Sequence, residues 1–222
     1  MCARFTLAAV DAKFVAFYFQ LNDVPELPPR YNIAPSQKIA TIGAKSDGTT
    51  RGLAMMQWGF VPHWASSPAD GPKPVNARSE TVRTSPPFRD SFRSRRCLIP
   101  ADGFYEWQTQ GKQKIPHRFS PKGGGLLALA GIYDVWKSPG LPSLFTCAIL
   151  TVPANDALKP FHDRMPAILQ PAQFAAWLNP ATQPDDAMRF LATSPDDMLA
   201  IDRANKALNK ANFEGPECWR VD

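Results

Sequence analysis

The stretch RRCLIPADGFYEWQ, residues 95–108, contains the pattern that decides the fold class. An apolar run ends at Ala101, the pair Asp102 and Gly103 follows, and aromatic residues begin at Phe104. Asp and Gly are typical of turns, and the flanking runs are typical of strands. The stretch therefore predicts a strand, a turn and a second strand. The next segments, QGK and IPHRFS, predict another turn and a third strand.

Four other segments predict strands because they are short, apolar and rich in β-branched or aromatic residues. They are KIATIGA (38–44), LAMMQWGFV (53–61), LLALAGIYDVW (126–136) and LFTCAILTV (144–152). A turn signal at Asp47 and Gly48 joins the first two. Helices are predicted over residues 5–20, which look amphipathic, and over 170–179, which have a proline in the first turn. Residues 186–193 and 202–210 carry weaker helical or loop patterns.

The whole chain predicts one mixed α+β domain, residues 1–222, with twisted strands near its centre and helices at its edges. The chain is 44% hydrophobic and 20% charged, which is typical of a globular protein and not of a disordered one. No apolar run approaches the roughly 18 residues of a membrane span. The start also lacks the basic region of a signal peptide. We expect a monomer without membrane association, in the cytosol or nucleoid.

The cysteines and histidines predict no metal centre and no disulfide framework. The four cysteines form no CxxC or zinc-type spacing, and the three histidines are scattered. Cys97 and Cys147 lie in apolar runs and are expected to be small buried residues, whereas Cys218 carries no signal. No cofactor is expected.

The positive charge of the chain is concentrated in ARSETVRTSPPFRDSFRSRR, residues 77–96. This stretch holds six arginines and only two acidic residues. Arginine makes forked contacts to phosphate, so the cluster favours nucleic-acid binding. The alternative interpretation is a solvated surface helix with scattered ion pairs.

Glu106 and His162 are the candidate acid and base groups. Glu106 lies among Phe104, Tyr105 and Trp107, and on a regular strand it shares a face with Phe104. Desolvation by aromatic neighbours raises a carboxyl pKa toward neutrality, which suits proton transfer. His162 lies in the proline-bracketed loop PFHDRMP, and rigid loops often carry catalytic residues. The alternatives are an exposed strand glutamate and a structural histidine.

The other two histidines, His63 and His117, lack comparable surroundings. Among the tryptophans, Trp64 follows a proline turn in WGFVPHW, and Trp107 follows Glu106. Beside an arginine-rich segment such rings can stack on unpaired bases, although core packing is the more usual use of tryptophan. At the chain start, removal of Met1 would give Cys2 a free α-amine beside its thiol.

Six motifs occur in an order that resembles the SRAP family, the abasic-site processing proteins of the SOS-response-associated peptidase group. They are MCARF, RYNIAP, WGFVPHW, NARSET, CLIPADGFYEW and HDRMP, and they run from residue 1 to about 166. The segment ALNKANFEGPEC resembles the family's C-terminal signature. The resemblance implies a single SRAP domain with a mixed β-barrel-like core and a basic groove for single-stranded DNA.

The resemblance also implies the role of each site residue. Cys2, made the first residue by removal of Met1, would bond covalently to an abasic site as a thiazolidine. One departure from the family pattern is Ala3, where glycine is expected; the small side chain implies only a slight backbone adjustment. The implied catalytic partners of Cys2 are Asn76, Glu106 and His162, the implied phosphate contacts are Arg4, Arg78 and Arg164, and the further DNA contacts are Trp64 and Trp107.

The expected partner is single-stranded DNA that contains abasic sites, near junctions with duplex DNA, and the replication machinery is a second expected partner. Strand cleavage by β-elimination is an expected side activity. Two alternatives remain open. One is a thiol peptidase or autopeptidase that uses Cys2 with His162 and with Asn76 or Glu106. The other is a non-covalent reader of single-stranded or modified DNA, for which Cys2 is irrelevant.

Overall fold

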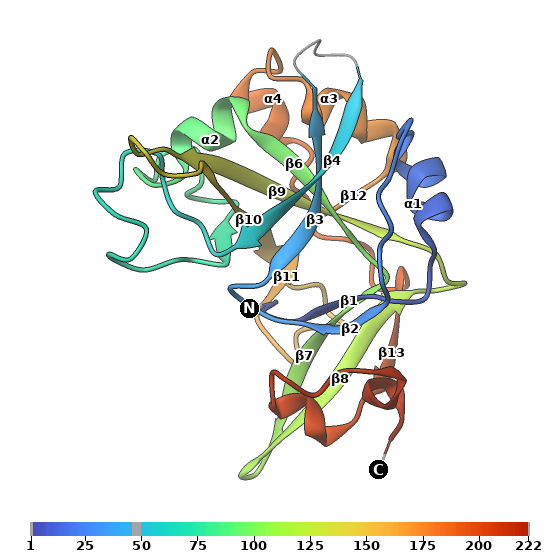
Figure 1. Ribbon diagram of the computed structural model, residues 1–222. Coiled ribbons are helices and arrows are strands. Elements are labelled where there is room, and N and C mark those ends of the chain that lie inside the picture. Colours follow the sequence, from blue (N-terminus) through green and yellow to red (C-terminus); the bar gives the residue numbers. More distant parts are fainter. Residues whose placement is uncertain (1, 46–49, 222) are drawn as a thin grey trace.

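The computed structural model describes residues 2–45 and 50–221. The chain forms two β-sheets with short helices around them (Figure 1). The larger sheet contains β3 (Lys38–Ala44), β4 (Arg51–Trp58), β5 (Asn76–Arg78), β6 (Arg96–Ala101), β9 (Leu127–Trp136), β10 (Leu144–Pro153), β11 (Arg164–Pro166) and β12 (Ile168–Leu169). The smaller sheet has the order β13 (Leu199–Arg203), β8 (Gln113–Pro121), β7 (Gly103–Gln110), β1 (Phe5–Leu7) and β2 (Arg30–Ile33).

Five strands of the larger sheet close into a barrel. They follow one another in the order β10, β4, β3, β6 and β9. β9 then pairs back onto β10, antiparallel, from Leu144 opposite Trp136 to Ile149 opposite Gly131. Closure leaves few unpaired strand edges, and the interior can be filled with apolar side chains. The α+β class and the barrel-like core that the family resemblance implied are confirmed.

The stretch that decides the fold class is a corner between the two sheets. The predicted strand, turn and strand are β6 and β7, but β6 belongs to the barrel and β7 to the smaller sheet. The buried Asp102 carboxylate holds the corner by accepting the backbone N–H groups of Ala8, at 2.5 Å, and Ala9. At Gly103 a Cβ would lie 2.9 Å from the Arg118 Nε atom and 3.0 Å from the Phe119 carbonyl oxygen, so a larger residue there would force these neighbours to shift.

The helix predicted over residues 5–20 is wrong in its first part. Residues Phe5–Leu7 form β1, and the helix α1 spans only Ala12–Phe19. Phe5 pairs with Phe104 on one side and Ile33 on the other, so a strand there satisfies backbone groups that a helix would leave unpaired against the sheet. Asp11 caps α1 by accepting a backbone N–H from its first turn.

The other short elements lie around the sheets. α2 is Arg89–Ser94, η1 is Pro171–Gln173, α3 is Phe174–Leu178, α4 is Pro184–Met188, η2 is Lys206–Asn209 and η3 is Pro216–Trp219. The helix predicted over residues 170–179 is confirmed as η1 and α3. Of the two weaker patterns, residues 186–193 are helical only up to Met188. Residues 202–210 divide between the strand β13 and the short helix η2. The turn signal at Asp47 and Gly48 lies outside the described residues. Figure 1 shows α2, α3 and α4 along one end of the barrel and the C-terminal turns beside β7 and β8.

Candidate active site

The chain start lies along β7 in the smaller sheet. Phe5 of β1 is opposite Phe104 of β7, in antiparallel register. The ladder continues toward the N-terminus, because the Tyr105 backbone N–H donates to the Arg4 carbonyl at 2.9 Å. Residues 2–4 therefore run alongside the next residue of β7, which is Glu106. Cys2 is fully buried there, which is unusual for a chain end.

Asn76 reaches the chain start from β5, a strand of the larger sheet outside the barrel. β5 runs parallel to β10, with Asn76 opposite Ile149. The Asn76 side chain is buried, and its Nδ2 group donates to the Cys2 carbonyl at 2.9 Å. Within the described part of the chain no group donates to the second polar atom of this amide, Oδ1. Asn76 therefore fixes the backbone of Cys2 and keeps one acceptor for a ligand.

Glu106 is only 3% exposed and lies on β7 beside the chain start. Its neighbour in the strand pattern, Phe104, packs into the main core, whereas Tyr105 and Trp107 pack on the opposite side, as the alternation predicted. Burial, with a smaller contribution from the Asp163 carboxylate, raises the pKa of Glu106 to about 7. Burial and then the nearby Glu106 raise the pKa of the Cys2 thiol above its ordinary value. The acid and the thiol thus share one desolvated space.

His162 lies in a loop that docks on the smaller sheet. Phe161 packs its ring edge-on against His117 and Phe119, at 4.7 Å and 5.1 Å between centroids. The His162 Nδ1 atom is 2.9 Å from the Arg164 backbone nitrogen and 2.7 Å from the Asp163 Oδ1 atom.

One ring nitrogen cannot accept from one of these neighbours and donate to the other at once. The neutral ring suits the backbone N–H of Arg164, and the protonated ring suits the carboxylate of Asp163. Burial lowers the pKa of His162, which favours the neutral ring with its proton on Nε2. Asp163 also acts on Glu106, so the loop brings His162 to the same site.

The three arginines that the resemblance assigned to phosphates differ in their exposure and in their hydrogen-bond partners. Arg78 is exposed on β5, two residues after Asn76. Arg4 is half-buried, and its Nη1 group donates to the Asn32 side chain at 2.8 Å. Arg164 is buried, and its two terminal nitrogens donate to the two carboxylate oxygens of Glu80. Arg78 is thus open to solvent, whereas the guanidinium of Arg164 is covered by Glu80, a residue that sequence reasoning left without a role.

The arginine-rich segment is not one continuous basic surface. Arg96 is 2% exposed and donates to backbone carbonyls at the ends of α2 and α3, among them Phe92 and Trp177, both at 2.7 Å. Three further arginines of the segment form ion pairs, Arg95 with Asp134, Arg83 with Asp185 and Arg89 with Asp90. The interpretation of the whole segment as a nucleic-acid footprint is therefore corrected: part of it caps helices, because buried carbonyls need donors.

The two tryptophans of the predicted DNA contacts also differ. Trp64 is 57% exposed beside a mostly apolar hollow of about 240 Å³, whose lining includes Phe60 and Pro62. Trp107 is half-buried, and its Nε1 group donates to the Asn209 side chain at 2.7 Å. Trp64 thus offers a free ring face, whereas Trp107 is tied to the C-terminal segment, on the face of β7 opposite Glu106.

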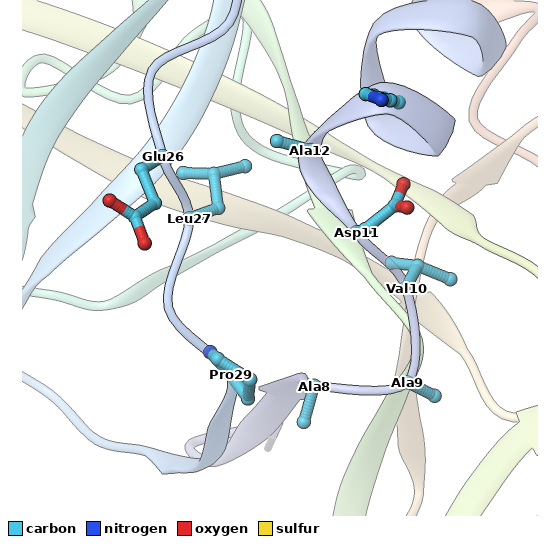
Figure 2. A pocket seen from close by; sticks show the side chains of 9 residues that line it. Ala8, Ala9, Val10, Asp11, Ala12, Glu26, Leu27 and Pro29 are labelled. Atoms are coloured by element: carbon cyan, nitrogen blue, oxygen red, sulfur yellow. The ribbon is translucent and has the colours of Figure 1, made fainter.

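Two further features of the described chain involve none of the predicted site residues. A hollow of about 470 Å³ lies between residues 8–13 and the segment Glu26–Pro29, and no predicted site residue lines it. Figure 2 shows the side chains around it. His63, which the sequence left without notable surroundings, places Nδ1 3.0 Å from the buried Asp134. Among the described residues no cluster of His, Cys, Asp and Glu could hold a metal ion. In the same part of the chain no helix is long and apolar enough to cross a membrane.

A family model described as SOS response associated peptidase (SRAP) matches residues 1–211 of the chain. The chain belongs to the SRAP family. The candidate site residues, from Cys2 to Arg164, all lie within the matched range. This range also includes β13 and η2 of the C-terminal part.

The chain is similar to other proteins over most of its length. The Abasic site processing protein YoqW of Bacillus subtilis strain 168 is 39% identical over 224 residues, 98% of each chain. The Abasic site processing protein HMCES of Xenopus tropicalis is 30% identical over 227 residues, 89% of this chain and 67% of the relative. The crystal structure of a protein from Bacteroides thetaiotaomicron covers 100% of both chains with a TM-score of 0.88 at 25% identity.

Proposed function

We propose that this SRAP protein processes abasic sites in single-stranded DNA and does so by a covalent thiazolidine crosslink through Cys2, after removal of Met1. The names of the relatives, abasic site processing proteins, support the first part. One structural observation supports the second. Asn76 holds the Cys2 carbonyl at 2.9 Å beside Glu106, a buried carboxyl whose pKa is raised to about 7. Met1 itself lies outside the described residues.

The chemistry needs both nucleophiles of an N-terminal cysteine. The ring-opened sugar of an abasic site presents an aldehyde at C1′. The α-amine adds to this carbon, and the carbinolamine loses water to leave an imine. The thiol sulfur then bonds to the same carbon, while the nitrogen takes up the thiol proton. The product is a five-membered ring, and the second attack is intramolecular and therefore strongly favoured.

Glu106 and His162 are placed to move the protons of this sequence. A carboxyl with a pKa near 7 is present in both forms at neutral pH, so it can accept a proton from the amine and return one to the departing water. The neutral ring of His162 can transfer protons to and from the sugar oxygens. It can also transfer protons when the crosslink is reversed. If the reaction stops at the imine, the same groups can assist β-elimination and strand cleavage. Asn76 Oδ1 is the acceptor available to the linkage.

Arginines would contact the DNA backbone, and an aromatic ring would contact a base. Arg78 is exposed beside Asn76, and Arg4 follows Cys2 by two residues, so both are near the point where a phosphate would flank the lesion. Arg164 can contribute once a phosphate competes for it with Glu80. Trp64 supplies an exposed ring for stacking on an unpaired base. These contacts position the strand without reading sequence, and the junction with duplex DNA and the replication machinery stay predicted partners.

The burial of Cys2 favours this mechanism over a thiol peptidase. A peptidase needs a reactive thiolate, and thiolates form where the pKa is lowered. Burial raises the pKa of the Cys2 thiol, so attack led by the amine, with the thiol second, is the better match. The non-covalent reader requires no role for Cys2 at all.

The test uses a single-stranded oligonucleotide with one abasic site and a denaturing gel. The protein should give a band that survives boiling in detergent. Cys2→Ala should abolish it, while Cys147→Ala, a matched change of a fully buried cysteine in the barrel, should keep it. A normal yield of stable crosslink from Cys2→Ala would refute the thiazolidine.

A pair of tagged proteins tests the amine separately. An uncleavable N-terminal tag should abolish the crosslink, because the α-amine would be locked in a peptide bond, whereas a C-terminal tag should not. If the N-terminally tagged protein crosslinks at the full rate, the amine takes no part. Offering a peptide in place of abasic DNA tests the peptidase alternative.

A further inference from the structure

The C-terminal segment, residues 204–219, lies beside β7 and β8 (Figure 1). It packs on the side of β7 that carries Tyr105, opposite Glu106. Its buried residues Leu208 and Cys218 form a second hydrophobic cluster with Tyr105. The Arg118 guanidinium lies 4.1 Å above the ring of Trp219, a cation–π contact. The segment is therefore packed on the sheet that carries the chain start.

Asn32 joins this segment to the chain start. It lies on β2 and is completely buried. Its Oδ1 atom accepts from Nη1 of Arg4 at 2.8 Å. Its Nδ2 group donates to the carbonyls of Phe213, at 2.7 Å, and Lys210, at 3.2 Å. The amide oxygen thus accepts from the cation, and the amide nitrogen donates to the two carbonyls.

Arg4 is held from two sides by this arrangement. The same Nη1 group donates to the Leu208 carbonyl at 3.1 Å, so both acceptors fix one corner of the guanidinium. The carbonyl of Arg4 accepts from the backbone N–H of Tyr105 at 2.9 Å, which fixes its main chain. With Nη1 occupied, Nη2 and Nε define the direction in which Arg4 can bind an anion.

We propose that Asn32 is a positioning residue that, together with the C-terminal segment, aims Arg4 at a phosphate of the DNA strand. The inference rests on the proposed function, because it places DNA at the site that begins with Cys2. Aspartate could not replace Asn32 in this role, since a second carboxylate oxygen would face the carbonyls of Lys210 and Phe213. An aliphatic residue would leave Arg4 without its buried acceptor.

The experiment is a double-mutant cycle on the binding of undamaged single-stranded DNA, measured over a range of salt concentrations. Arg4→Ala should lower the magnitude of the slope of log affinity against log salt by roughly 0.7, the value for one phosphate contact to a single strand. Asn32→Ala should lower it by a similar amount. The double variant should bind within about twofold of either single variant, because the two residues act as one unit.

The control is Asn209→Ala, which removes the bond between Asn209 and Trp107 in the same C-terminal segment without touching Arg4. It should keep the wild-type salt slope. Asn32→Ser serves as a second variant should Asn32→Ala fail to fold, and it should show the same coupling to Arg4→Ala.

Three outcomes would overturn the proposal. They are additive effects of the Arg4 and Asn32 changes, a wild-type slope in the Asn32 variants, and a wild-type slope in Arg4→Ala. Because undamaged DNA forms no crosslink, these outcomes are separate from a failure of the Cys2 chemistry, which would appear only on the abasic oligonucleotide.

Discussion

The barrel and the smaller sheet hold their strands by different means. In the barrel, five strands close on themselves, and side chains such as Leu98, Leu129 and Ile149 are completely buried. In the smaller sheet, β1 is short, and its register with β2 shifts within three residues. Side-chain bonds between residues far apart in the sequence support it, such as Arg4 to Leu208, which are 204 positions apart.

This difference between the two sheets indicates where a substitution should affect the proposed reaction without unfolding the protein. A closed barrel is stabilised mainly by apolar burial, which many side chains can supply. The smaller sheet depends on particular donors and acceptors, and it is the sheet that carries Cys2 and Glu106. Changes in the barrel should therefore act on stability, and changes in the smaller sheet on the reaction.

Among variants that keep Cys2, the largest expected effect is that of Glu106→Gln on the rate of crosslinking. The variant should form the crosslink about 10²–10⁴-fold more slowly, because glutamine fills the same space but transfers no proton. Single-turnover rates on the abasic oligonucleotide measure this. Gln108→Ala, two residues along the same strand, is the matched control and should react at the wild-type rate. Equal rates for wild type and Glu106→Gln would remove Glu106 from the mechanism.

Leu129→Ala in β9 should lower the stability of the protein and leave the crosslinking rate unchanged. A large-to-small change in a fully buried site should lower the free energy of unfolding by about 2–5 kcal/mol. Under conditions where the variant is folded, the crosslinking rate should stay within about twofold of wild type. Urea denaturation and the same single-turnover assay measure the two quantities. A large loss of rate in the folded variant would mean that the barrel and the site are not separable.

The raised pKa of Glu106 should also appear in the stability. The folded protein keeps this proton up to about pH 7, whereas the unfolded chain releases it near its ordinary pKa of 4.5. The wild type should therefore lose stability relative to Glu106→Gln as the pH rises between these values. The difference in the free energy of unfolding should reach about 3 kcal/mol, because each pKa unit corresponds to about 1.36 kcal/mol. Urea denaturation of both proteins across this range measures it, and parallel curves would contradict it.

The smallest expected effect is that of Arg78→Ala. The variant should lower the magnitude of the salt slope of single-strand binding by roughly 0.7, with the same loss on different sequences. Its free energy of unfolding should change by less than about 0.5 kcal/mol, because the residue is exposed. Arg96→Ala, from the same arginine-rich segment, should instead destabilise the fold and leave the slope unchanged. A base preference lost in Arg78→Ala would contradict the assignment to phosphate.

Much of the site could be predicted from short motifs, because each motif keeps neighbouring groups together along the chain. The alternation around Glu106 correctly separated Phe104 from Tyr105 and Trp107. What the motifs could not give was the partner of each charged group. Arg164 faces Glu80 and Arg95 faces Asp134 across the fold, so neither pairing leaves a local pattern.

The sequence by itself determined most of the long strands, the α+β class and the choice of candidate site residues. These follow from local alternation, turn residues and the order of the motifs. Only the tertiary structure decided that β6 and β7 lie in different sheets, that Arg96 caps helices, and that the buried Asn32 joins Arg4 to the C-terminal segment. The physical reason is that a strand's partner and the burial of a polar side chain depend on contacts between distant residues. The local pattern is the same whichever partner satisfies it.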